Sequence, residues 1–326
     1  MDRAAGVSLE AVSLTKRFSA RTAVSDVSFT ARQGEVLGLL GRNGAGKTTT
    51  IRLLTTVLAP TSGDFSVDGL PSSRPAEIRR RVGVLPESAG YPGNQTGVEY
   101  LRYHARLYGL ARADAVLIAG RLLTEVGLAE RAASTISTYS RGMRQRLGIA
   151  RALVNDPAVV FLDEPTLGLD PAGQRQVLEL VREIAQRRGA TVILSTHTLP
   201  DVEEVCTTVL ILDAGKVLVS GTVAEVTRAA AAPRSGQLRV PISLVGRAAE
   251  ALSGVVGLTL ESAEERPDVL RISLNGEARV RLDDPDAGMN AALHALISAE
   301  VPVLSFEVEG ARLSDAFLTM TREGAR

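Results

Sequence analysis

The residues with the clearest chemical potential form a glycine-rich loop that ends in a lysine and a hydroxyl group. Residues 41–48 read Gly-Arg-Asn-Gly-Ala-Gly-Lys-Thr, after the apolar run 35–40 and before the helix-favouring stretch 48–58. Glycines let successive backbone N–H groups point at one anion, and the dipole of the following helix favours negative charge at the same place. Nearly all basic residues are arginine, yet this loop ends in Lys47. We therefore expect a nucleoside triphosphate site, with Lys47 on the β- and γ-phosphates and the Thr48 hydroxyl on Mg²⁺.

A pair of carboxylates at the end of an apolar run is the second candidate. Asp163 and Glu164 directly follow the strand-like segment 159–162. In isolation such a pair is more often a solvated loop. Downstream of a phosphate loop, the end of a buried parallel strand would bring the pair beside the phosphates. Asp163 could then order Mg²⁺ and its waters, and Glu164 could polarise the water that attacks the γ-phosphate.

Three further features are individually ambiguous. Ser140 opens a helical stretch in Tyr-Ser-Arg-Gly-Met-Arg-Gln-Arg (139–146), where it could cap an ordinary helix or form a second anion site. Residues 168–170 read Gly-Leu-Asp, shortly after Glu164. His197 follows the apolar run 191–195 and could contact a γ-phosphate or its attacking water, or be a plain surface histidine, as we expect for His104 and His294.

Composition restricts the class of protein. The 326 residues carry no formal net charge and only 3% aromatic residues, so nothing indicates a nucleic-acid partner. Cys206 is the only cysteine, which excludes an intrachain disulfide and fits a reducing compartment. The sequence shows no secretory signal and no run of 18 apolar residues, so we expect no membrane span in this chain.

The pattern along the chain predicts an α/β fold with two domains. In residues 1–230, short apolar runs at 82–85, 159–162 and 191–195 are typical of buried parallel strands, and a helical subdomain is expected over about 87–139. The small-residue segment 229–236 predicts a linker. Residues 236–326 then predict a small α+β domain of ferredoxin-like βαββαβ order. Its expected strands are 237–244, 257–262, 269–274 and 301–308, its helices 247–252 and 288–299, with a possible extra strand at 278–282 and a final helix at 313–321.

In this order and spacing, the motifs resemble those of the nucleotide-binding subunit of an ABC transporter, over residues 7 to about 225. The loop 41–48 resembles the Walker A motif, 159–164 Walker B, 140–144 the family signature, Asp170 the D-loop and His197 the switch histidine. Phe18 falls where an aromatic ring stacks on the adenine. The resemblance implies ATP contacts from Phe18, Gly41, Arg42, Asn43, Gly44, Ala45, Gly46, Lys47, Thr48, Thr49, Ser140, Arg141, Gly142, Met143 and Asp170.

The resemblance also implies how such a protein works. Glu164 and His197 would be catalytic in ATP hydrolysis, and Thr48, Asp163 and Glu87 would serve Mg²⁺. Two copies would meet head to tail, each ATP lying between the Walker A loop of one and the signature helix of the other. The stretch Tyr-Ser-x-Gly-Met-Arg-Gln-Arg and the segment 313–319 are similar to ATPases of the ABC-2 exporter class, so we expect a separate membrane permease and a place at the cytoplasmic face of the membrane. The alternative is a non-transport ABC ATPase acting on ribosomes or DNA, which usually carries tandem cassettes or long coiled coils.

Two departures from the family pattern stand out. Glu87 occupies the position of the Q-loop glutamine, and its negative charge would change the electrostatics beside the metal. Arg141 and Met143 replace a glycine and a glutamine of the general signature, while Ser140 and Gly142 keep its anion-binding character.

Overall fold

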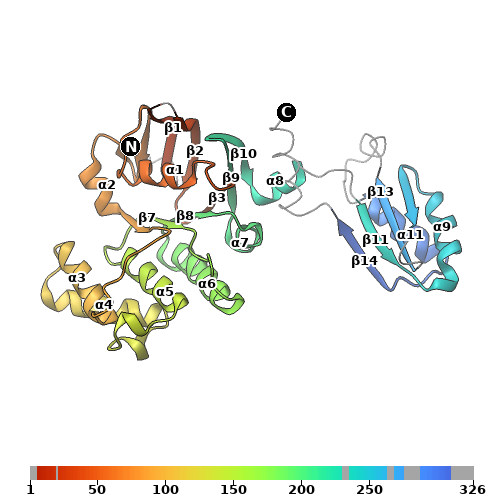
Figure 1. Cartoon of the computed structure of the whole chain (residues 1–326). Coiled ribbons are helices and arrows are strands. Elements are labelled where there is room, and N and C mark those ends of the chain that lie inside the picture. Colours follow the sequence, from red (N-terminus) through yellow and green to blue (C-terminus); the bar gives the residue numbers. More distant parts are fainter. Residues whose placement is uncertain (1–5, 20, 230–234, 263–267, 275–286, 310–326) are drawn as a thin grey trace. The chain divides into compact units, whose positions relative to one another are not determined.

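The computed structural model describes residues 6–19, 21–229, 235–262, 268–274 and 287–309, and it divides into two compact units (Figure 1). The units are Met1–Val223 and Ala224–Arg326. Helix α8 (Val223–Ala229) begins at their boundary. The expected linker, 229–236, lies just beyond this helix, and its residues 230–234 are outside the described part of the chain.

The first unit is built on a six-stranded sheet in the order β10-β9-β3-β8-β7-β6. Strands β3, β6, β7, β8 and β9 run parallel, and β10 is antiparallel to β9. Each apolar run that predicted a buried strand is a strand here. The bounds are β3 Val36–Leu40, β6 Val82–Leu85, β7 Val159–Asp163, β8 Thr191–Thr196, β9 Thr208–Asp213 and β10 Lys216–Thr222.

The register of this sheet decides what meets at its edge. Leu40 pairs with Thr196, and Asp163 pairs with Ser195, so β3, β8 and β7 end side by side. The glycine loop, His197 and Glu164 each directly follow one of these strand ends. Parallel strands bring their carboxyl ends to one edge, and residues far apart in sequence therefore converge there.

A second, antiparallel sheet in the first unit has the order β2-β1-β4-β5. The sequence pattern did not predict it, because register shifts between Ala11 and Leu14 and between Leu14 and Lys16 interrupt the alternation that marks a half-buried strand. Apolar residues of this sheet, of helix α1 and of the parallel sheet form one core. The bounds are β1 Val7–Phe18, β2 Arg21–Arg32, β4 Ser62–Val67 and β5 Leu70–Pro71.

Between β6 and β7 the chain is helical, as the sequence predicts. Figure 1 shows α3, α4 and α5 grouped below the sheet in this view. Thr96 starts α3 with a capping box, in which its side chain accepts from the Glu99 amide and the Glu99 carboxylate accepts from the Thr96 amide. The segments are α3 Gly97–Leu107, α4 Arg112–Glu125, η1 Ala129–Arg131, η2 Ile136–Thr138 and α5 Arg141–Ala152. The other helices of the unit are α1 Lys47–Leu54, α2 Pro75–Arg81, α6 Pro171–Arg188 and α7 Leu199–Val205.

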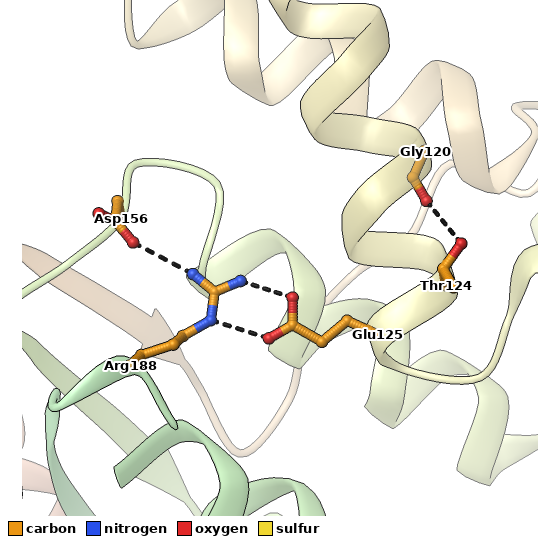
Figure 2. A network of polar contacts seen from close by, with 5 residues as sticks. All are labelled: Gly120, Thr124, Glu125, Asp156 and Arg188. Atoms are coloured by element: carbon orange, nitrogen blue, oxygen red, sulfur yellow. Dashed lines mark hydrogen bonds and ion pairs between the residues drawn. The ribbon is translucent and has the colours of Figure 1, made fainter. Parts of the chain in front are cut away.

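Arg188, the last residue of α6, joins the end of α4 to the loop that precedes β7 (Figure 2). Its guanidinium donates from Nε and Nη2 to the two carboxylate oxygens of Glu125, at 2.8 and 2.6 Å, and from Nη1 to Asp156 at 3.1 Å. These carboxylates raise the pKa of Arg188 above its ordinary value. A planar guanidinium that grips one carboxylate with two bonds holds α4 in a fixed orientation.

After α8, the described elements of the second unit follow the βαββαβ order that the sequence predicts, in an antiparallel sheet ordered β12-β13-β11-β14. Strand β11 is shorter than expected because Pro241, which cannot donate to a ladder, precedes the turn η3. The bounds are β11 Ser235–Arg239, η3 Ile242–Leu244, α9 Val245–Ser253, β12 Leu258–Ser262, β13 Val269–Leu274, α11 Ala287–Ser298 and β14 Ser305–Glu309. The strand expected at 278–282 and the helix expected at 313–321 lie outside the described residues.

Cys206 packs at the end of α7 beside Gly38, where an added Cβ would lie 3.0 Å from its sulfur, and burial raises the pKa of its thiol. Among the described residues, none of the helices combines the length and the apolar character needed to cross a bilayer.

Candidate active site

The loop after β3 packs tightly against neighbouring backbone. A Cβ at Gly41 would lie 2.5 Å from the carbonyl oxygen of Leu212, and one at Gly46, whose φ is 108°, would lie 2.7 Å from that of Ala23. Only glycine therefore fits at either position. The Ala45 amide donates to Arg42 at 3.0 Å, and α1 begins directly at Lys47, so the helix start is directed at the loop.

Lys47 is held inside this loop by two oxygens. It is 6% exposed, and its ammonium donates to the carbonyl oxygen of Gly41 at 2.7 Å and lies 3.4 Å from Oε1 of Glu164. A buried charge of this kind costs free energy unless it is paired and hydrogen-bonded. The loop thus holds the Lys47 ammonium at a position where a phosphate oxygen would replace the Glu164 carboxylate as its partner.

Glu164 links the ends of β7 and β8. It has a φ of 50°, an uncommon value for a residue with a side chain, and its amide donates to the carbonyl oxygen of Ser195 at 2.8 Å. Its second oxygen, Oε2, lies 2.8 Å from Nδ1 of His197. A carboxylate 7% exposed is therefore paired with Lys47 on one side and with the imidazole on the other.

These groups border a cavity of about 490 Å³. The predicted residues that line it are Phe18, Arg42, Asn43, Gly44, Gly46, Lys47, Thr48, Thr49, Glu87, Glu164 and His197. Sequence reasoning missed three further lining residues, Arg21, Ala23 and Leu167. Arg21 is the first residue of β2 and comes shortly after Phe18, the last residue of β1. Its place beside the cavity can be predicted only when the β1–β2 hairpin has been recognised.

The residues predicted for Mg²⁺ fit a small hard cation. Asp163 is 3% exposed, and its Oδ1 has no hydrogen-bond partner among the described residues. A buried, unpartnered carboxylate oxygen is costly, and a cation or its bound water would satisfy it. Thr48 and Glu87 both line the cavity and add oxygen donors.

The signature residues lie elsewhere. Ser140, Arg141, Gly142, Met143 and Asp170 are not among the residues that line the 490 Å³ cavity. Ser140 caps α5 by accepting from the Met143 amide at 3.2 Å, and Asp170 caps α6 by accepting from the Gly173 amide at 3.0 Å. A Cβ at Gly168 would lie 2.6 Å from the guanidinium carbon of Arg141, so the signature helix contacts the Gly-Leu-Asp turn of its own chain.

Glu87 borders a second cavity as well. This cavity of about 460 Å³ is lined by Glu87, Arg141, Arg144 and Gln145 among others. The residue at the Q-loop position therefore faces both the phosphate loop and the start of the signature helix.

The other histidines differ from each other. His294 is exposed, as expected. His104 is only partly exposed, because it packs edge-on against Tyr100 and Tyr103 with ring centroids 4.6 and 5.4 Å apart. Burial, with a smaller contribution from Arg151, lowers the pKa of His104 to about 4. The expectation of a plain surface histidine was wrong at this position.

A parallel sheet with a glycine loop, a buried lysine and a strand-end carboxylate pair defines a P-loop ATPase. The ABC transporter family profile matches residues 24–167. The daunorubicin/doxorubicin resistance ATP-binding protein of Streptomyces peucetius is 35% identical over 317 residues, which cover 96% of this chain and 92% of that protein. The bacitracin transport ATP-binding protein of Bacillus licheniformis is 38% identical over 64% of this chain and 68% of that protein. The chain therefore belongs to the ABC transporter ATP-binding subunits, a family that hydrolyses ATP to power transport.

Solved structures agree with this assignment. An ATP-binding subunit of an ABC transporter is 35% identical, with a TM-score of 0.61, over 68% of this chain and 92% of that one. A bacterial ABC transporter cassette at 22% identity has the same fold, with a TM-score of 0.61.

Proposed function

We propose that this protein is the ATP-hydrolysing subunit of an ABC-2 type exporter, acting with a separate membrane permease. The observation that carries the proposal is the chain Lys47–Glu164–His197 at the edge of the cavity, with 3.4 and 2.8 Å between its members. The named relatives serve drug resistance and bacitracin transport. No feature of the described residues favours the ribosome- or DNA-associated alternative.

In the proposed site, the role of each residue follows from its position. The loop amides and Lys47 hold the phosphates, Phe18 stacks on the base, and Thr48, Asp163 and Glu87 hold Mg²⁺, which would neutralise phosphate charge. Glu164 accepts a hydrogen bond from the attacking water. His197, whose side chain is 47% exposed, contacts the γ-phosphate and orients Glu164 through its Nδ1.

The signature residues are proposed to serve a second copy of the chain. Ser140 and Gly142 lie at the start of α5, away from the cavity that their own chain forms. A helix start with a serine hydroxyl can bind an anion, and Arg141 adds a positive charge there. Two copies arranged head to tail would place this surface on the γ-phosphate of the partner, so ATP would stabilise the closed dimer and hydrolysis would weaken it.

The permease is proposed to bind the helical part between β6 and β7, at the cytoplasmic face of the membrane. Large apolar side chains are exposed on α3, on α4 and just after α3: Tyr103, Leu107, Tyr108, Val116 and Leu117. Such a surface is typical of a protein interface. We propose that the ATPase domain spans residues 1–230 and the C-terminal domain residues 236–326. The C-terminal domain is proposed to bracket or regulate the dimer.

The substitution Glu164→Gln tests the catalytic assignment. It removes the carboxylate that polarises water but keeps the size of the side chain, so we expect the rate of ATP hydrolysis to fall about 10²- to 10⁴-fold. ATP binding should persist, and light scattering should show dimers that accumulate with ATP. Glu179→Gln, an exposed position on α6, is the matched control. Hydrolysis within a few-fold of wild type in Glu164→Gln would refute the assignment.

A further inference from the structure

A buried hydrogen bond lies behind the site and has no part in the roles given above. The hydroxyl of Thr166 donates to Oδ2 of Asp201 at 2.5 Å. Thr166 is 2% exposed and Asp201 is 5% exposed. Both belong to the first unit, and neither lines the 490 Å³ cavity.

Thr166 lies in the turn that connects Glu164 to Asp170. The Leu167 amide donates to the carbonyl oxygen of Glu164 at 3.2 Å, and the Leu169 amide donates to that of Thr166 at 3.1 Å. Two successive turns therefore meet at Thr166. A shift of this residue would move Glu164 on one side and the Asp170 cap of α6 on the other.

Asp201 lies in the first turn of α7, which begins at Leu199, two residues after His197. The same helix is tied to α6 where Arg182 donates to the carbonyl oxygen of Glu204 at 3.1 Å. The segments that carry Glu164 and His197 are consequently joined by the β7–β8 ladder, by the bond from the Glu164 amide to Ser195 and by their own side-chain contact. The bond between Thr166 and Asp201 joins them again on the far side of the Glu164 turn.

The bond between Thr166 and Asp201 is costly to maintain. Burial raises the pKa of Asp201, against the opposing effect of the Thr166 hydroxyl, and the charges of Glu204 and Glu164 raise it further while His197 lowers it. A buried polar contact that includes a carboxylate often stabilises a fold no more than an apolar pair of the same size does. What the polar pair provides and an apolar one does not is a single, directional spacing between the Glu164 turn and α7.

We propose that Thr166 and Asp201 are positioning residues for ATP hydrolysis, whose bond keeps the Glu164 turn and α7 at the spacing at which His197 meets Glu164. This inference rests on the proposed roles of Glu164 and His197. Without the bond, ATP would still bind, since the contacts given above for the phosphate loop involve Ala23, Leu212 and Glu164 and no residue of α7, but the two groups would be misaligned. Misplacement of reacting groups lowers the rate of the chemical step more than it lowers binding.

Thr166→Val removes the hydroxyl at nearly constant volume. We expect kcat to fall about tenfold to a hundredfold, the range for a lost hydrogen bond to a charged group, with KM and the Kd for ATP within twofold of wild type. Thr166→Ser keeps the hydroxyl and should stay within about threefold of the wild-type rate. Thr191→Val is the matched control, because Thr191 is equally buried and donates to Arg32 from the opposite end of β8. If Thr166→Val does not fold, Asp201→Asn tests the same bond with a neutral acceptor.

The imidazole of His197 gives a readout that does not depend on turnover. The chain has three histidines, so nitrogen NMR of histidine-labelled protein can resolve the His197 ring. Thr166→Val should shift the Nδ1 resonance of His197, and Thr191→Val should leave it in place. An unchanged resonance with an unchanged kcat would overturn the inference, as would an equal loss in Thr166→Val and Thr166→Ser.

The two proposals fail in different ways. If Glu164→Gln is inactive and Thr166→Val behaves as wild type, the positioning role is wrong and the catalytic assignment stands. If Glu164→Gln remains active, the catalytic assignment is wrong, whereas the His197 resonance in Thr166→Val still decides whether the bond positions the ring.

Discussion

The two units of this protein bury different kinds of residue. Every buried polar or charged side chain of the described residues lies in the first unit, where Lys47 and Glu164 line the cavity and Asp163 ends the strand β7. The described core of the second unit is apolar throughout. Buried polar groups cost stability unless their partners are well placed. The buried polar groups of the first unit thus lower its stability where the chemistry requires them, whereas the described core of the second unit is stabilised by apolar packing.

The largest expected effect on stability comes from breaking the apolar core of the second unit. Leu252 on α9 is fully buried, so Leu252→Ala should reduce the free energy of opening this unit by about 2–5 kcal/mol. Hydrogen exchange should show faster exchange of the α9, β11 and β13 amides, with the Kd for ATP unchanged. Leu304→Ala, at a position 58% exposed, is the control. A parallel loss of ATP binding would show that the two units are not independent.

A smaller effect should follow from cutting the polar link of the first unit. Arg188→Gln removes three charged hydrogen bonds, to Glu125 and Asp156, and should lower the free energy of unfolding by about 1.5–3 kcal/mol. Among the described residues, the neighbouring Arg187 is exposed and pairs with Glu183 one helical turn away, so Arg187→Gln should cost about 0.5 kcal/mol or less. Urea denaturation measures both. Equal effects of the two substitutions would mean that the link contributes no more than a surface pair.

The smallest expected effect is a pH dependence that comes from His104. Its folded-state pKa of about 4 lies below the ordinary value of 6.5, so the unfolded chain binds its proton more readily. The stabilising contribution is complete above pH 6.5 and is lost as pH falls toward 4. His104→Gln should therefore lose less stability between pH 7 and pH 5 than wild type does, as thermal denaturation would show. His294→Gln removes an exposed imidazole for comparison, and identical pH profiles of wild type and His104→Gln would contradict the prediction.

Sequence reasoning reached the phosphate loop, the strand-end carboxylates and His197 because each is local. A glycine loop followed by a helix, or an apolar run that ends in Asp163 and Glu164, can be recognised in a few consecutive residues. The order of the small C-terminal domain was accessible for the same reason. The features that sequence reasoning missed depend on contacts between residues far apart in the sequence. The β1–β2 sheet is hidden by bulges, and Thr166 and Asp201 are 35 residues apart with no pattern that pairs them.

The role of Glu87 shows the same limit more sharply. The sequence marks it as a departure from the glutamine of the family pattern, and it predicts a change in the electrostatics beside the metal. The structure adds that this side chain also borders the cavity of Arg141 and Arg144, on the side of the signature helix. Only the packing of separate elements creates such a position.

The single thiol of the chain makes it well suited to probe-based measurement. Cys206 lies at the end of α7 in surroundings that raise its pKa, so little thiolate is present near neutral pH to react with a maleimide or a spin label. A cysteine introduced on the surface would be labelled selectively in an otherwise unaltered protein. Distances between two such labels, one in each copy, would test during turnover whether the phosphate loop meets the signature helix as proposed.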